Sequence, residues 1–117
     1  MRLLILVLMA SSYIPTGAAQ TANGNLENGK RLFRRDGCWQ CHGYAGQGGR
    51  AGARIAATVL SAPALIRYVR RPTGEMPAYS EKVVSDQELT DVWAYLKSMT
   101  PPKPAKDIPL LRDIKER

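Results

Sequence analysis

Both cysteines and the single histidine of this 117-residue chain fall within five consecutive residues, Cys38-Trp39-Gln40-Cys41-His42. The order C-x-x-C-H is the signature of covalent haem attachment, in which each thiol adds to one haem vinyl group and forms a thioether bond. The two intervening residues let both sulfur atoms reach their vinyl groups, and the adjacent histidine then lies beneath the iron. The pattern predicts one haem c, held by Cys38 and Cys41, with His42 as an axial ligand of the iron.

Three other kinds of site use the same residue types and fit the sequence less well. A thioredoxin-like redox pair belongs in a βαβ context, and the chain shows no convincing strand pattern. A structural zinc site needs four ligands, and the chain has no cysteine or histidine outside the motif. A disulfide across so short a loop would constrain the unfolded chain little, and it would leave His42 without a role. Haem attachment is the interpretation that uses all three side chains.

The N-terminus is typical of a secretory signal peptide. Arg2 precedes an apolar run at 3–10, and the small residues Gly17 and Ala19 suit cleavage by signal peptidase. The run is shorter than the roughly 18 apolar residues that a membrane-spanning helix needs. We therefore expect residues 1–19 to be a cleaved signal peptide and the mature protein to be periplasmic, without stable membrane insertion. An uncleaved membrane anchor is the alternative.

The mature chain shows the patterns of short helices between long loops. Asn25 is the expected N-cap of a helix that ends at about residue 35, and Ser61 is the expected N-cap of a helix that runs to about residue 71. Ser85 and Glu88 form a capping box before an amphipathic helix that ends ahead of two prolines. These signals predict an all-α domain of three to four short helices around one haem, over residues 20–100. A Pro-rich tail follows at 101–117.

Because the chain has no second histidine, the sixth position of the iron is either filled by another residue type or left open. Met1 and Met9 lie in the expected signal peptide, which leaves Met76 and Met99. Met99 lies at the end of the amphipathic helix, where methionine is usually core filler. Met76 lies in a loop bounded by glycine and proline, and such a loop can direct a thioether inward. The sequence therefore favours Met76 as the second axial ligand.

The order of these features resembles that of class I cytochromes c. Residues 25–33 (NLENGKRLF) look like the first helix of that family, and the attachment motif with its following glycine occupies 38–43. Residues 74–79 (GEMPAY) are similar to the family's methionine loop, and residues 91–96 (DVWAYL) are similar to its final helix. The resemblance covers about residues 25–99.

The resemblance implies a cytochrome c-like fold with one exposed haem edge and with iron ligation by His42 and Met76. It also implies that the first helix crosses the last one, with Gly29 and Phe33 packed against Val92, Tyr95 and Leu96. The family often has a proline after the attachment motif, whose carbonyl group accepts a hydrogen bond from the proximal histidine. The corresponding stretch of this chain, 49–55, has no proline, and Ala53 is the residue that stands in for the family's proline.

Iron with both axial positions filled has no open site for oxygen or peroxide. We therefore expect an electron carrier rather than an enzyme, either free or as the cytochrome subunit or acceptor of a periplasmic dehydrogenase. The alternative is a haem enzyme or a gas-sensing haem protein with a displaceable sixth ligand.

Positive charge is concentrated in the first half of the expected domain. The chain has a net charge of +7, and between residues 30 and 71 nine basic residues face a single acid, Asp36. This pattern predicts protein redox partners with an acidic docking surface, and the alternative is that these are scattered solubilising charges. Nucleic acid is not an expected partner for an exported haem protein. The nine basic residues are Lys30, Arg31, Arg34, Arg35, Arg50, Arg54, Arg67, Arg70 and Arg71.

Overall fold

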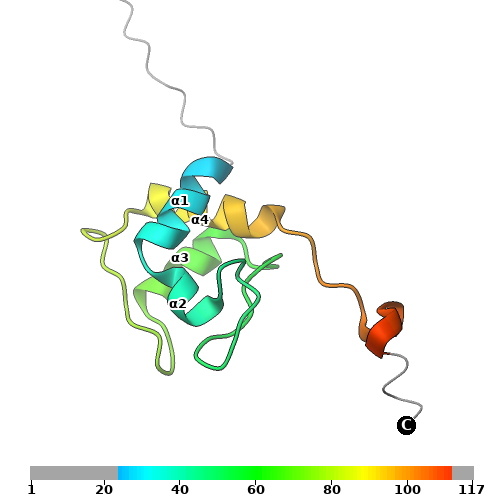
Figure 1. Cartoon of the computed structure of the whole chain (residues 1–117). Helices are drawn as coiled ribbons and strands as arrows, with labels where there is room; N and C mark the ends of the chain where they lie inside the picture. Colours follow the sequence, from blue (N-terminus) through cyan, green and yellow to red (C-terminus); the bar gives the residue numbers. More distant parts are fainter. Residues whose placement is uncertain (1–23, 112–117) are drawn as a thin grey trace, which may run out of the picture.

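The computed structural model describes residues 24–111, and these form helices joined by long loops (Figure 1). The elements are α1 (Leu26–Arg35), α2 (Cys38–His42), α3 (Ala62–Arg70), α4 (Asp86–Ser98) and a short 3-10 helix, η1 (Ala105–Asp107). Residues 24–111 contain no strand, and the prediction of an all-α, cytochrome c-like fold is confirmed. The predicted signal peptide, 1–19, lies outside the described residues. Within 24–111, no helix combines the length and apolar character that crossing a membrane requires.

The helices begin at the capping residues that the sequence predicts. The side chain of Asn25 accepts a hydrogen bond from the Asn28 backbone N–H at 2.9 Å, and Ser61 caps α3 in the same way. At α4 the capping box is complete. The Ser85 N–H donates to Oε2 of Glu88 at 2.8 Å, and the Glu88 N–H donates to Oγ of Ser85 at 3.2 Å. Each cap satisfies backbone donors that the first turn of a helix leaves without intrahelical partners.

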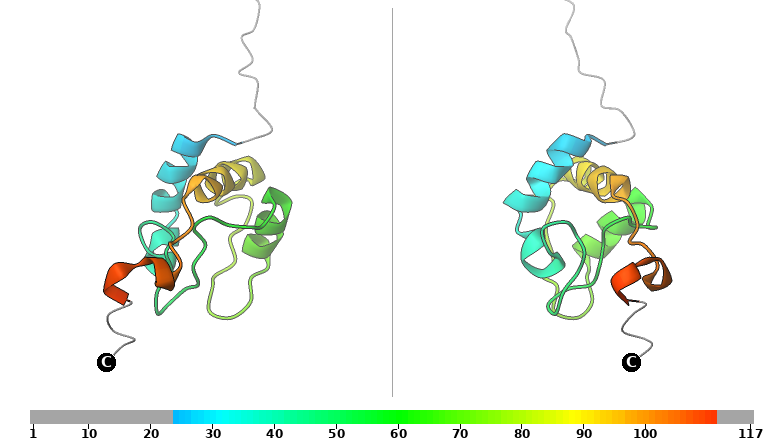
Figure 2. Two further views of the ribbon diagram at one scale, coloured as in Figure 1. Left: turned by 90° about the vertical axis from the view of Figure 1, so that its right-hand side faces the viewer. Right: turned by 45° about the vertical axis from the view of Figure 1, so that its right-hand side comes forward.

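Helices α1 and α4 cross at close range, as the family resemblance implies (Figure 2). Gly29 on α1 lies directly against the backbone of Asp91 and Val92 on α4. Further along the same face, the rings of Phe33 and Tyr95 lie 5.7 Å apart in a tilted arrangement. The crossing brings the start of α2 next to the helix pair, because only Asp36 and Gly37 separate α1 from α2.

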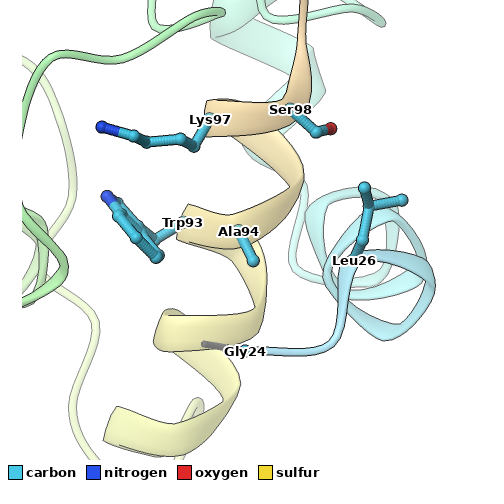
Figure 3. A pocket seen from close by; sticks show the side chains of 6 residues that line it. All are labelled: Gly24, Leu26, Trp93, Ala94, Lys97 and Ser98. Carbon is cyan, nitrogen blue, oxygen red and sulfur yellow. The ribbon is translucent and has the colours of Figure 1, made fainter. Parts of the chain in front are cut away.

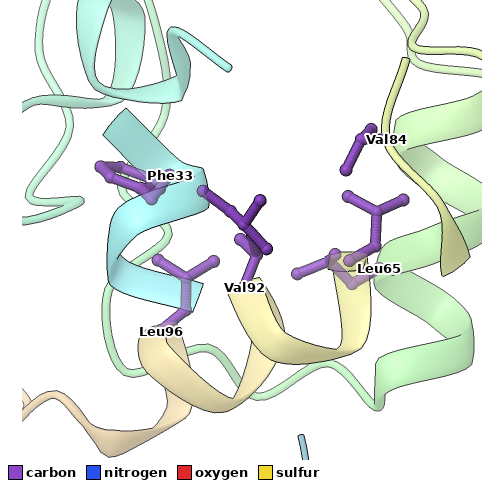
Figure 4. Close-up of a cluster of buried hydrophobic side chains, with 7 residues drawn as sticks. Phe33, Leu65, Val84, Val92 and Leu96 are labelled. Carbon is purple, nitrogen blue, oxygen red and sulfur yellow. The ribbon is translucent and has the colours of Figure 1, made fainter. Parts of the chain in front are cut away.

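The hydrophobic core lies where α1, α3 and α4 meet (Figure 4). Trp39, Tyr79 and Met99 are partly buried and pack against it from the attachment motif, from the loop before α4 and from the end of α4. The core therefore positions both the motif and the loop that carries Met76. Its buried members are Leu32, Phe33, Leu65, Val84, Leu89, Val92 and Leu96.

The chain after α4 extends away from the helices. Residues 101–104 form an extended connection to η1, and Figures 1 and 2 show this segment separate from the helix pair. Leu110 and Leu111 are 73% and 41% exposed. The domain boundaries of 20–100 and 101–117 remain predictions.

Candidate haem site

The attachment motif forms a helical turn of its own, α2. In a helix, residues three positions apart lie on one face, so Cys38 and Cys41 present their thiols to the same side. The turn begins after Gly37, which has a φ of 74°, a left-handed conformation that glycine adopts without strain. Cys38 is partly buried, Cys41 is exposed, and no disulfide joins them. Both thiols are therefore available for bonds to a haem.

The chemistry of Cys38 differs from that of a redox-active thiol. Burial raises the pKa of the Cys38 thiol to about 11, and the nearby carboxylate of Asp36 acts in the same direction. Reactive cysteines in C-x-x-C redox motifs instead have lowered pKa values, because a thiolate is the attacking species. A neutral sulfur in an apolar setting fits a thioether better than a thioredoxin-like centre.

The imidazole of His42 is held by the backbone of the following loop. Its Nδ1 lies 2.6 Å from the carbonyl oxygen of Ala53. A carbonyl oxygen can only accept, so Nδ1 carries the proton and Nε2 keeps its lone pair for a metal. Such a bond orients a metal-binding imidazole and raises its basicity. The expectation that Ala53 replaces the family's proline carbonyl is therefore confirmed.

The glycine-rich loop that supplies this carbonyl is folded tightly against α2. The Gly48 N–H donates to the carbonyl oxygen of His42 at 2.8 Å, which ties the loop to the end of the motif. Gly48 has a φ of 83°, and a Cβ there would lie 2.6 Å from the backbone nitrogen of Arg54. At Gly52, a Cβ would lie 2.9 Å from the carbonyl oxygen of Cys41. Glycine at both positions lets the loop approach the motif closely enough for Ala53 to reach His42.

The two candidate methionines have different surroundings. Met99 follows the last residue of α4 and packs against the hydrophobic core, as expected of core filler. Met76 is partly buried, lies in the loop between α3 and α4, and does not belong to that cluster. The structure thus leaves the thioether of Met76 outside the core. Its bond to the iron, like the roles of Cys38, Cys41 and His42, remains a prediction.

The loop that carries Met76 is anchored to the motif by Tyr79. The phenol of Tyr79 donates to the carbonyl oxygen of Asp36 at 3.0 Å, two residues before Cys38. Its backbone N–H donates to the carbonyl oxygen of Val69 on α3 at 3.2 Å. Sequence reasoning did not assign Tyr79 this role, although the residue belongs to the stretch that resembles a methionine loop.

Two of the nine basic residues form ion pairs within the described part of the molecule. Nε of Arg35 lies 2.6 Å from Asp36, and its Nη1 lies 2.9 Å from Glu88. These two carboxylates raise the pKa of the Arg35 guanidinium. Arg70 pairs with Asp86. Both arginines therefore stabilise the fold and are poor candidates for recognising a partner.

Two hollows on the described surface are lined by residues outside the motif. One is lined by Gly24, Leu26, Trp93, Ala94, Lys97 and Ser98 (Figure 3). Another is lined by Ile66, Arg67, Arg70, Arg71, Glu81 and Asp86. Neither contains Cys38, Cys41, His42 or Met76, and it is the motif with its hydrogen bonds that indicates the haem site.

The donor set fits a haem c. Two free thiols share one face of α2, and the adjacent imidazole has one nitrogen occupied by a carbonyl group and the other available. Residues 24–111 contain no cluster of three or more His, Cys, Asp and Glu side chains that could hold a bare metal ion. These residues would hold the haem by two thioether bonds and ligate its iron from one side.

The comparison with protein families agrees with this site. The family described as cytochrome c oxidase, cbb3-type, subunit III matches residues 24–96. The chain belongs to this family and is thus a class I c-type cytochrome, a haem electron-transfer protein. It carries covalently bound haem c with its iron, and Cys38 and Cys41 fit the attachment motif. No curated protein and no solved structure matches the chain.

Proposed function

We propose that the protein is a periplasmic electron carrier with a single haem, which passes one electron at a time between protein partners. Cys38 and Cys41 form the two thioether bonds, and His42 and Met76 are the axial ligands. The hydrogen bond from Nδ1 of His42 to Ala53 is the observation that most supports this proposal, because it prepares Nε2 for the iron. The bound haem supplies a reversible one-electron couple.

The residues of the chain determine how that couple behaves. The bond from His42 to Ala53 makes the imidazole a stronger donor, which favours the oxidised iron. A thioether ligand from Met76 favours the reduced iron and raises the potential. With both positions filled, small molecules have no open place on the iron. The protein then has to bury the haem, hold its ligands and leave one edge accessible for electron exchange.

The partners we propose are membrane-bound or periplasmic redox proteins. The family description names a subunit of a cbb3-type oxidase, so an oxidase of that type is a candidate acceptor, and a periplasmic dehydrogenase is a candidate donor. A surface rich in carboxylates would complement the basic residues of the domain. Lys30 and Arg34, both exposed on α1, lead towards the attachment motif and are suited to this contact.

The ligand assignment is tested by exchanging the two methionines for alanine, one at a time. Met76→Ala should abolish the weak red absorption band of methionine bound to ferric iron and should allow carbon monoxide to bind ferrous iron. Met99→Ala should keep the band and exclude carbon monoxide, at a cost in stability of about 1–3 kcal/mol from the lost core packing. The opposite pair of phenotypes would identify Met99 as the ligand.

The same measurement separates a carrier from a haem enzyme or gas sensor. Unmodified protein should keep its spectrum under carbon monoxide, because Met76 occupies the sixth position. Rapid and complete binding of carbon monoxide to the unmodified protein would instead indicate a displaceable ligand, and the carrier proposal would then be wrong.

A further inference from the structure

Arg70, the last residue of α3, contacts the loop that carries Met76 at two points and the start of α4 at a third. Its Nη1 donates to the carbonyl oxygen of Tyr79 at 2.9 Å, and its Nη2 donates to the carbonyl oxygen of Val84 at 2.9 Å. Nη2 also pairs with the carboxylate of Asp86, the first residue of α4. The Arg70 side chain is only 20% exposed, so these contacts are partly shielded from solvent.

The contacts matter because the loop has no regular secondary structure of its own. Residues 71–85 contain no helix or strand, and a loop without regular structure has to be ordered by specific bonds. Tyr79 is held on both sides, by the Val69 carbonyl at its N–H and by Arg70 at its carbonyl oxygen. Only Pro77 and Ala78 lie between Tyr79 and Met76. The position of Tyr79 therefore restricts where the thioether of Met76 can lie.

We propose that Arg70 is the positioning residue for Met76. Its guanidinium fastens the second half of the loop to α3 and α4, and this keeps the sulfur of Met76 at the sixth coordination position. The inference rests on the proposed ligation by Met76. It gives Arg70 a role different from that of Lys30 and Arg34, because its charge acts inside the molecule rather than towards a partner.

A planar guanidinium is suited to this task in a way that an ammonium group is not. Arginine presents several N–H donors in a fixed arrangement and can serve three acceptors at once. A lysine at the same place would keep the positive charge and much of the stem, but one point charge cannot reproduce all three bonds. Arg70→Lys is therefore expected to fold while loosening the loop.

The test compares the holoprotein with Arg70→Lys and Arg70→Gln, and with Arg67→Lys and Arg67→Gln as matched controls. Arg67 lies one turn earlier on α3 and lines the same hollow, and its side chain makes no hydrogen bond or ion pair within residues 24–111. In the Arg70 variants, the methionine band should weaken and the apparent affinity of the ferrous iron for carbon monoxide should rise about tenfold, because charge-assisted hydrogen bonds are lost. Amide exchange at Tyr79 and Val84 should also accelerate.

The outcomes separate the role of Arg70 from the ligation by Met76 on which it depends. A methionine band, carbon monoxide affinity and amide exchange that are the same in Arg70→Lys, Arg70→Gln and the unmodified protein would overturn the role of Arg70 alone. Equal effects in the Arg67 variants would also overturn it, because charge near the loop would then suffice. If unmodified protein lacked the methionine band, the ligation by Met76 and the inference would fail together. If the Arg70 variants did not fold, Asp86→Asn, which removes the negative charge from one of the three acceptors, should still weaken the band, and no change in it would overturn the inference.

Discussion

A Cβ atom placed on Gly29 would lie 1.9 Å from the backbone carbonyl oxygen of Asp91. Real Cβ atoms do not approach an oxygen so closely, and the obstacle is backbone rather than a flexible side chain. The same Asp91 is 5% exposed, and its carboxylate accepts hydrogen bonds from the N–H of Asn25 and from Nδ2 of Asn28, both at 2.7 Å. The crossing of α1 and α4 is thus held by a close backbone contact and by a buried carboxylate beside it.

Gly29→Ala should therefore destabilise the domain, although alanine is the better helix former by about 1 kcal/mol. The added methyl group forces the two helices apart, and we expect a loss of roughly 2 kcal/mol or more in the free energy of unfolding. Urea unfolding of the holoprotein measures this loss in the free energy of unfolding. Gly49→Ala is the control, since a Cβ there has its nearest neighbour at 4.0 Å. Equal midpoints for the two variants would show that α1 can shift without cost.

Covalent attachment is tested by replacing both motif cysteines with alanine. We expect the haem of the double variant Cys38→Ala/Cys41→Ala to pass completely into acid–acetone, because no thioether bond remains to hold it. Met76→Ala is the control, since it loses an iron ligand but keeps both thiols, and its haem should stay with the protein. Haem that resists extraction from the double variant would contradict attachment at these residues.

The capping box of α4 predicts a pH-dependent stability. The backbone N–H of Ser85 and, after it, the guanidinium of Arg35 lower the pKa of the Glu88 carboxyl from its ordinary value of 4.5. A lowered pKa in the folded state gives stability that is present above pH 4.5 and is lost as the pH falls through the folded value.

Glu88→Gln removes the charge but keeps an acceptor for Ser85. We expect it to lower the urea midpoint at pH 7 and to match the unmodified protein at a pH well below 4.5. Glu81→Gln is the control, because the Glu81 side chain makes no hydrogen bond or ion pair within the described part of the chain. A difference for Glu88→Gln that is independent of pH would mean that the charge contributes nothing.

Electrostatic recognition is tested on α1. Lys30 and Arg34 are exposed and lie four residues apart, so they share one face of the helix. Reversing both to glutamate should slow oxidation by hexacyanoferrate(III), an anionic probe, by tenfold or more at low salt. The effect should fade as the Debye length falls to about 8 Å at physiological ionic strength.

The same reversal at Lys103 and Lys106, in the segment after α4, is the control and should change the rate less. Stopped-flow measurements at several salt concentrations give the oxidation rates of both double variants. If the two pairs of reversals slowed the reaction equally, the net charge of the protein would matter and the position of Lys30 and Arg34 would not.

Local features of the chain were predictable because they depend on neighbouring residues. The spacing of Cys38, Cys41 and His42 indicates the haem chemistry by itself, since the reacting groups are adjacent in the chain. The caps at Asn25 and Ser85 are likewise local, because each side chain bonds a backbone group three residues away. The contact of Gly29 with α4 and the bond from His42 to Ala53 followed from the family resemblance.

Tertiary structure alone decided what the charged side chains do. In the sequence, Arg35 and Arg70 are two of nine similar basic residues, and apart from the Asp36 beside Arg35 nothing in residue type or spacing separates them from Arg34 or Arg67. The fold separates them by bringing a carboxylate 53 residues away to Arg35 and two backbone carbonyl groups to Arg70. Backbone carbonyls are the same at every residue, so only their arrangement in space determines which of them an arginine can bind.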